Sequence, residues 1–88
     1  MTDTERKVIV GGRYRHPDKF NTEYIVEKII MDATGEEETG TLGEIVIYRQ
    51  VVAGIYPIDT IYARTVKDFL SQMEYQGKVV NKFELTSK

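Results

Sequence analysis

Seven tyrosine, arginine and histidine side chains on three short segments are of the types that hold ligands. Tyrosine and arginine are enriched at binding surfaces, because each combines a broad flat contact area with hydrogen-bond donors. Arginine also forks onto carboxylates and phosphates. The pattern predicts a surface that binds a small anionic, nucleotide-like ligand or a short peptide or nucleic-acid segment. Its predicted members are Tyr14, Arg15, His16, Tyr48, Arg49, Tyr62 and Arg64.

A second interpretation of these residues requires no ligand. The tyrosines would be core residues with hydroxyls at the surface, and the arginines would pair with Glu23, Glu27 or Glu44. His16 lies beside arginines, whose like charge disfavours its protonated form. A hydrogen-bonding role for His16 in the core or in a turn therefore competes with a ligand role. The two interpretations differ in whether the seven side chains gather on one surface.

The sequence contains little of the machinery that catalysis needs. It has no cysteine and a single histidine, and its serines, Ser71 and Ser87, stand outside any Gly-x-Ser-x-Gly motif. A thiolate nucleophile, a zinc–thiolate site and an iron–sulfur cluster are excluded. The glycines match no phosphate-binding loop. We therefore expect a non-catalytic module without metal or cofactor, and a small hydrolase using His16 with Glu23, Glu27 or Glu44 is the lesser alternative.

Length and charge narrow the expected partners. The chain has 88 residues, the size of one domain, and a formal net charge of -2 with both signs mixed. It lacks the clustered basic residues of a strong nucleic-acid binder. It also lacks a secretory signal in MTDTERK and an apolar run of about 20 residues for a membrane helix. We expect a cytoplasmic protein with a small-molecule or protein partner, and a domain this small often self-associates, so a homo-oligomer is another expectation.

Alternation of apolar and polar residues predicts a mainly β chain. Strands are expected over 23–31, 44–52 and 60–64, with shorter extended stretches at 7–10 and 12–16. The longest one is apolar on both sides, which favours a curved sheet or a barrel. Simple alternation places Ile25, Ile29 and Met31 on one face and Tyr24, Val26 and Ile30 on the other. In the next strand it places Ile45, Ile47 and Arg49 opposite to Val46, Tyr48 and Gln50.

One short helix is expected after Thr65, which has the type and position of an N-cap. Thr65-x-x-Asp68 resembles a capping box, and the apolar residues Val66, Phe69, Leu70 and Met73 follow at helical spacing. Gln76-Gly77 then predicts a tight turn between strands at 73–75 and 79–85. The acidic run Glu36–Glu38 lies in a polar loop over 32–43, where a solvated tip competes with phosphate mimicry or cation binding.

These elements predict an SH3-like β-barrel of five or six strands, with the short helix before the last hairpin. The barrel would span residues 7–88 as a single domain, after a frayed N-terminus over 1–6. An OB-type barrel and an open, strongly twisted sheet are the alternatives. The functional alternative to a ligand-binding module is a protein-interaction module or accessory subunit.

Three segments carry a resemblance to a known family. GGRYRHPDKFNTEYIVEKI, EIVIYRQV and IYARTVKDFLSQMEYQGKVVNKFEL resemble, in order and spacing, the small bacterial and phage family catalogued as domain of unknown function 1653. The likeness covers Gly11 to Glu84 and implies a bacterial or phage-encoded protein, but no particular activity. The positions that match the family pattern are Tyr14, Arg15, His16, Tyr24, Val26, Tyr48, Arg49, Arg64, Phe69, Gly77, Lys78, Val80 and Phe83. Tyr62 replaces the usual tryptophan, Thr65-Val66 a Pro-Leu pair, and Asn81-Lys82 a Pro-Arg pair.

Overall fold

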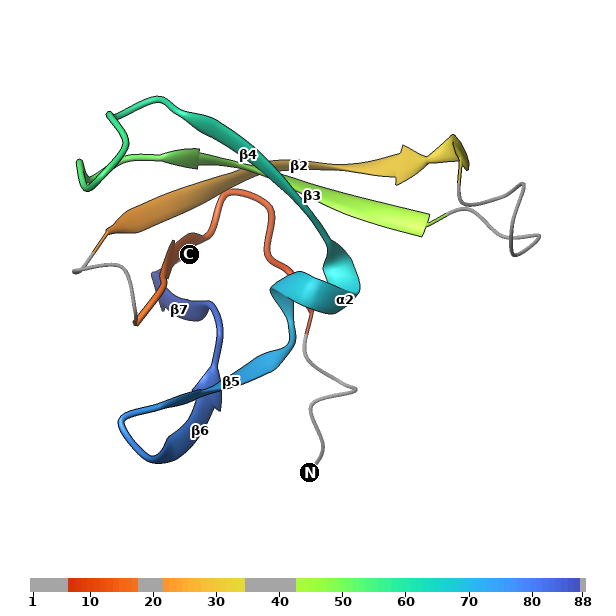
Figure 1. Ribbon diagram of the computed structural model, residues 1–88. Helices are drawn as coiled ribbons and strands as arrows, with labels where there is room; N and C mark the ends of the chain where they lie inside the picture. Colours follow the sequence, from red (N-terminus) through yellow and green to blue (C-terminus); the bar gives the residue numbers. More distant parts are fainter. Residues whose placement is uncertain (1–6, 18–21, 35–42, 88) are drawn as a thin grey trace.

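Two antiparallel sheets and the short helix α2 are the main elements of the computed structural model, which describes residues 7–17, 22–34 and 43–87. The elements are β1 (Arg13–Arg15), β2 (Glu23–Asp32), β3 (Gly43–Gln50), β4 (Ile61–Thr65), α2 (Val66–Phe69), β5 (Gln72–Tyr75), β6 (Lys78–Asn81) and β7 (Glu84–Ser87). The larger sheet has the order β4-β3-β2-β1-β7, and β5 and β6 form a separate hairpin. In Figure 1, β2, β3 and β4 form the upper layer and the hairpin projects below.

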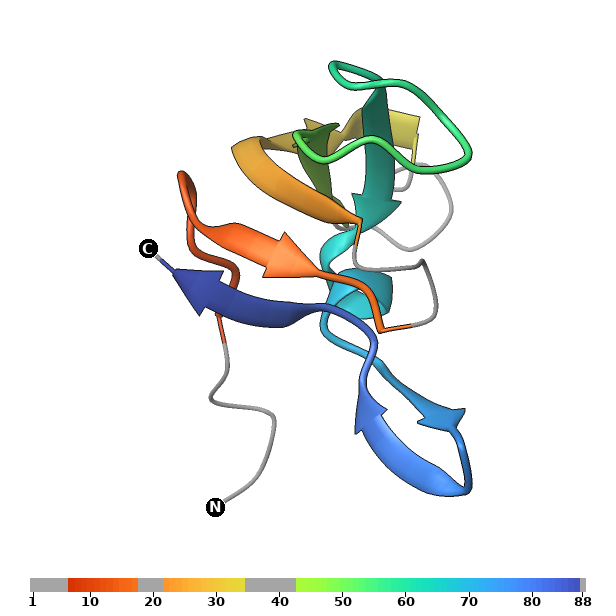
Figure 2. The ribbon, with the colours of Figure 1, turned by 90° about the vertical axis from the view of Figure 1, so that its left-hand side faces the viewer.

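The mainly β prediction is confirmed, and all the strand pairs are antiparallel. The described strands form no closed barrel, because the ladder ends at β4 on one side and at β7 on the other. The sheet curls instead, so that β7 lies well below β2 and beside β1 (Figures 1 and 2). The predicted frayed terminus at 1–6 and the acidic run Glu36–Glu38 lie outside the described residues.

A β-bulge in β2 overturns the predicted faces of its second half. The register shifts between Val26 and Lys28, so that Ile29 lies opposite Val46 and Ile30 opposite Ile45. An extra residue at a bulge resets the alternation of side chains. The first half of β2 has its predicted faces. In the second half, Ile29 shares the face of Val26 and Ile30 turns to the opposite face, which is the reverse of simple alternation.

The predicted helix forms, but it is shorter than its apolar spacing suggests. The backbone N–H of Asp68 donates to Thr65 Oγ1 over 3.0 Å, which confirms Thr65 as the N-cap. The helix ends at Phe69, because both the N–H and the hydroxyl of Ser71 donate to the carbonyl of Asp68. Met73 therefore lies in β5 and not on the helix. A helix of one turn depends on tertiary packing for its stability.

The Gln76-Gly77 turn is confirmed, with φ values of 53° and 79° at the two residues. Positive φ at both central positions is typical of a type I′ turn, which suits a two-residue hairpin. The single strand predicted over 79–85 is wrong, because β6 ends at Asn81. The chain then turns Phe83 inward before β7 begins and pairs with β1. The extended stretch expected at 7–10 leads into a turn, closed by a hydrogen bond from Gly12 N–H to Ile9 O.

The core is largely aromatic and lies on one face of the larger sheet, which we call the inner face. Its buried residues are Tyr14, Tyr24, Val26, Val46, Tyr48, Phe69 and Phe83. Phe69 and Phe83 stack at 4.2 Å between ring centroids, and Tyr14 meets Phe69 edge-on at 5.0 Å. Tyrosine places a hydroxyl at the far end of an apolar ring. A core built on tyrosines therefore carries polar groups on the inner face.

Candidate ligand pocket

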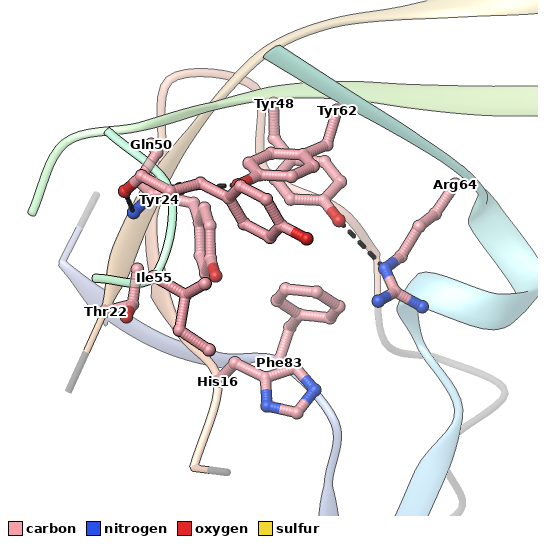
Figure 3. A pocket seen from close by; sticks show the side chains of 10 residues that line it. His16, Thr22, Tyr24, Tyr48, Gln50, Ile55, Tyr62, Arg64 and Phe83 are labelled. Atoms are coloured by element: carbon pink, nitrogen blue, oxygen red, sulfur yellow. Dashed lines mark hydrogen bonds between the residues drawn. The ribbon is translucent and has the colours of Figure 1, made fainter. Parts of the chain in front are cut away.

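A pocket of about 140 Å³ opens on the inner face of the sheet, and aromatic rings form its walls. Tyr48 and Tyr62 lie directly opposite each other on β3 and β4, and their rings stack at 5.2 Å. Tyr24 from β2 meets them edge-on at 5.3 and 5.8 Å. Phe83 completes the wall, 5.4 Å from Tyr48 (Figure 3). Cross-strand register therefore assembles the rings of three strands into one surface.

The buried side chain of Gln50 ties the β3–β4 loop to this wall. Its Oε1 accepts a hydrogen bond of 2.6 Å from the hydroxyl of Tyr62. Its Nε2 donates to the carbonyls of Tyr56 and Val52, at 2.7 and 3.1 Å. Gln50 is only 1% exposed. Because buried polar groups need hydrogen-bond partners, these three hydrogen bonds stabilise the buried amide. Gln50 thus fixes both a pocket ring and the path of the loop.

Two residues of this loop, Ile55 and Tyr56, line the pocket, although both are largely exposed, at 80% and 58%. At Gly54 the loop closely approaches Thr22, the residue before β2, and a Cβ atom at Gly54 would stand 2.6 Å from Thr22 Oγ1. Gly54 also donates its N–H to the carbonyl of Tyr56 over 3.2 Å. Contact with Thr22 and hydrogen bonding to Gln50 together hold an apolar rim over the opening.

Arg64 is the positively charged side chain of the pocket lining. Its Nε donates to Tyr48 Oη over 2.8 Å, and its guanidinium carbon lies 5.2 Å from the ring centroid of Phe83. Its Nη1 pairs with Asp68 at 2.6 Å, and Lys82 pairs with the other oxygen of the same carboxylate at 2.9 Å. Two cations share one carboxylate, which leaves a positive charge at this end of the pocket. Hydrogen bonds from Arg64 and then Lys82 lower the pKa of Asp68.

Burial favours the neutral form of three pocket tyrosines, Tyr24, Tyr48 and Tyr62, by raising the pKa of each. Burial, with smaller contributions from Tyr62 and Tyr48, raises the pKa of Tyr24 to about 12. Burial also raises the pKa of Tyr48 and of Tyr62. Neutral phenols act as hydrogen-bond donors and acceptors but not as general bases. Among the described lining residues none is acidic, and Arg64 is the charged one.

The seven residues predicted to gather on one surface do not all lie on the same surface. His16, Tyr48, Tyr62 and Arg64 line the pocket. His16 is buried and meets Phe83 edge-on at 5.1 Å. In Figure 3, Arg64 stands at one end of the pocket, with Gln50 and Thr22 at the other.

Tyr14, Arg15 and Arg49 lie elsewhere. Tyr14 is buried in the core, and its hydroxyl accepts a hydrogen bond of 3.0 Å from the N–H of Ile9. Arg15 and Arg49 point to the opposite face of the sheet, because side chains alternate along a strand. Arg15 pairs with Glu84, and Arg49 pairs with Glu27 and Asp59. The expected gathering of all seven side chains on one surface is therefore corrected to a smaller set, the four that line the pocket.

The sequence interpretation missed six lining residues: Thr22, Tyr24, Gln50, Ile55, Tyr56 and Phe83. Two of them carried a usable signal. Gln50 shares a strand face with Tyr48, and Tyr24 lies on the same side of the neighbouring strand, directly opposite Gln50. The other four, Thr22, Ile55, Tyr56 and Phe83, carried no signal in the strand pattern, because they lie outside the regular strands and helix.

The hydrolase alternative needs His16 and a carboxylate in one pocket. The described pocket lining contains His16 but no carboxylate. Glu23 and Glu27 pair instead with Arg13 and Arg49. The part of the chain that the structure describes also contains no group of three or more His, Cys, Asp or Glu side chains that would hold a metal ion. The described lining therefore does not bring together the pair of groups on which the hydrolase alternative depends.

No family model matches the chain, and neither a curated protein nor a solved structure matches it. No helix among the described residues is long and apolar enough to cross a membrane. The pocket itself combines aromatic walls, phenol hydroxyls and a guanidinium.

Proposed function

We propose that this domain is a non-catalytic binding module whose pocket takes one flat ring of a small anionic, nucleotide-like ligand. The volume of about 140 Å³ is close to that of the engineered cavity of ~150 Å³ that holds one benzene molecule. A single ring therefore fits, and the rest of the ligand would extend past Ile55 and Tyr56. Faces and edges of the surrounding rings suit stacked and edge-on contacts with an aromatic guest.

The charge of the pocket favours an anionic group on that guest. Within the part of the chain that the structure describes, Arg64 and Lys82 share a single carboxylate, that of Asp68. An incoming carboxylate or phosphate adds a second negative charge to two positive ones, in a partly buried setting where charge-assisted hydrogen bonds are strong. A cationic guest would meet Arg64 without a compensating carboxylate in the described lining. The observation that carries the proposal is this guanidinium at the end of an aromatic pocket.

Titration calorimetry with matched pairs of probes tests the proposal. Each pair shares a ring and differs in charge: benzoate with benzyl alcohol, and nucleoside 5′-monophosphates with their nucleosides. We expect the anionic member to bind more tightly, and Arg64→Gln to remove most of that preference. Arg49→Gln is the matched control, because both arginine side chains are 32% exposed and ion-paired, but Arg49 lies on the other face.

The outcomes separate cleanly. Saturable binding of an anionic probe that depends on Arg64 and not on Arg49 supports the module. If no anionic probe binds at millimolar concentration, or if the two substitutions have equal effects, the pocket does not have the proposed role. A thermal-shift screen should agree, because a ligand that binds only the folded state raises its stability.

A protein-interaction module or accessory subunit is the second candidate. Four large apolar side chains, Ile55, Tyr56, Ile58 and Ile61, are exposed within seven residues along the pocket rim and the start of β4. Concentrated apolar exposure of this kind is typical of interaction sites. Ile58 lies outside the pocket lining. The substitution Ile58→Ser should therefore weaken the binding of a protein partner and leave the binding of a small-molecule ligand unchanged.

We extend the proposal to the type of β-fold and to the biological origin of the protein. A curled antiparallel sheet with a one-turn helix before the last hairpin supports an SH3-like barrel that stays open between β4 and β7. The resemblance to the domain of unknown function 1653 supports a bacterial or phage-encoded protein. The absence of cysteine is consistent with a cytoplasmic location.

A further inference from the structure

The edge strand β4 has few of the features that usually protect an edge against pairing. It is five residues long, Ile-Tyr-Ala-Arg-Thr, and pairs with β3 in unbroken register from Ile61 to Thr65. It contains no lysine, proline or bulge, which are devices that block an edge in natural proteins, and its one charged residue, Arg64, is already bonded to Tyr48 and Asp68 of the same chain. Ile61 on this strand is 55% exposed. Among the described strands, none pairs with the other edge of β4.

The opposite edge, β7, is protected by comparison. It has four residues, it begins with Glu84, and its pairing with β1 shifts register at Arg13/Tyr14. A charge and an irregular register both disfavour further strand addition. The two edges of the same sheet therefore differ, and β4 is the edge with the properties of an interface.

We propose that β4 pairs antiparallel with β4 of a second copy of this chain, about a two-fold axis at Ala63. This register pairs all five residues: Ile61 with Thr65 of the partner subunit, Tyr62 with Arg64 of the partner subunit, and Ala63 with Ala63 of the partner subunit. A shift of two residues in one direction places Arg64 opposite Arg64 of the partner subunit, and like charges directly opposite are destabilising. A shift in the other direction pairs only three residues of each strand.

Side-chain chemistry agrees with this register on both faces. Tyr62 and Arg64 belong to the inner face, since they pair with Tyr48 and Val46 in β3. In the dimer each guanidinium would lie beside a tyrosine ring of the other subunit, which is a favourable cation–π contact. On the outer face the axis passes between two small alanines, which allows the strands to approach closely.

The pairing joins the two pockets. Directly opposed residues have Cβ atoms about 4.5–5.5 Å apart, so Arg64 of the partner subunit would stand beside Tyr62 at the pocket wall. An anionic ligand would then meet one guanidinium from each subunit, and the groove would suit a ligand with two anionic groups. This last step rests on the proposed ligand-binding function, whereas the strand pairing does not.

Charge reversal at the axis tests the pairing without any ligand. Sedimentation equilibrium should show a dimer, over concentrations that cover dissociation constants from about 1 µM to about 1 mM. Ala63→Glu alone and Ala63→Lys alone should each be monomeric, because like charges face each other, and a mixture of the two should form a heterodimer. Ala53→Glu, an exposed alanine in the β3–β4 loop, is the control and should leave the dimer intact. A wild-type monomer throughout this range, or a dimer unaffected by Ala63→Glu, overturns the proposal.

Cysteine mapping gives a second readout that tolerates modest destabilisation. The chain has no cysteine, so one introduced thiol reports one position. Opposed strand residues have Cα atoms about 4.5–5.5 Å apart, within disulfide range. Under mild oxidation Ala63→Cys should cross-link rapidly, and Ile61→Cys should cross-link with Thr65→Cys but not with itself. If Ala63→Cys cross-links no faster than Ala53→Cys, the proposed register is wrong. Neither experiment contains a ligand, so its failure is distinguishable from a failure of the binding function.

Discussion

Arg64 and Tyr48 form a single polar unit at the end of the pocket, joined by a hydrogen bond of 2.8 Å from Nε to the phenol oxygen. The phenol is held in the core, and the guanidinium is held by the phenol and by Asp68. The cation is therefore positioned before any ligand arrives. Such positioning lowers the entropy lost when an anion binds.

Removal of the phenol oxygen should loosen this unit. In Tyr48→Phe the Nε–H of Arg64 loses its acceptor, and water replaces it only in part. We expect a loss of about 1 kcal/mol in the free energy of unfolding, together with weaker binding of anionic probes. Urea unfolding and calorimetry measure the two effects. Tyr56→Phe is the control, since Tyr56 is exposed. Equal losses of unfolding free energy in the two variants would contradict a stabilising bond between Arg64 and Tyr48.

Replacement of Gln50 should release the β3–β4 loop. Gln50→Leu leaves the hydroxyl of Tyr62 and two loop carbonyls without their buried partner, which costs about 1–3 kcal/mol. Hydrogen exchange should become faster at the amides that follow Gln50, over residues 51–60, while β1 is unaffected. Gln72→Leu, an exposed glutamine in β5, is the matched control. Unchanged exchange in the loop would show that Gln50 does not anchor it.

A methyl group at Gly54 should clash with Thr22. Because the added Cβ would stand 2.6 Å from Thr22 Oγ1, Gly54→Ala should destabilise the fold by about 1–3 kcal/mol. The cost should fall when Thr22→Ala removes that oxygen. A double-mutant cycle on the free energy of unfolding measures the coupling. Additive effects of the two substitutions would contradict the close contact.

The fold should weaken in alkali because of Tyr24. Its pKa lies near 12 in the folded state, above the ordinary value of 10.0, so the folded chain holds the phenolic proton more tightly than the unfolded chain. The resulting stabilisation is complete below pH 10 and is lost as the pH rises from 10 to about 12. Tyr24→Phe should therefore flatten the decline of the unfolding free energy over this range. An unchanged slope would show that Tyr24 titrates normally.

Alternation along β3 and β4 predicted a large part of the fold and of the site. It separated Val46, Tyr48 and Gln50 from Arg49, and it placed Tyr62 with Arg64. The same rule, applied strictly, already separated Arg15 from His16. Grouping the residues by type alone obscured that separation, and two arginines were assigned to the wrong face.

The remaining features depend on contacts between distant parts of the chain. No residue type near Glu27 predicts the bulge, which places Ile29 and Ile30 on the faces opposite to those expected from simple alternation. The turn that buries Phe83 against Phe69 follows from packing in the completed core. The rim of Ile55 and Tyr56 depends on a hydrogen bond to an amide several residues away. Local pattern specifies strands and caps, whereas long-range packing specifies how the pocket closes.

The tyrosine wall also gives the protein a built-in optical signal. The chain has no tryptophan, so its near-ultraviolet emission comes from six tyrosines, and four of them line the pocket. A guest that stacks on Tyr48, Tyr62, Tyr24 or Tyr56 would alter most of that emission at once. Occupancy of the pocket can therefore be followed in the unlabelled wild-type protein by its own fluorescence.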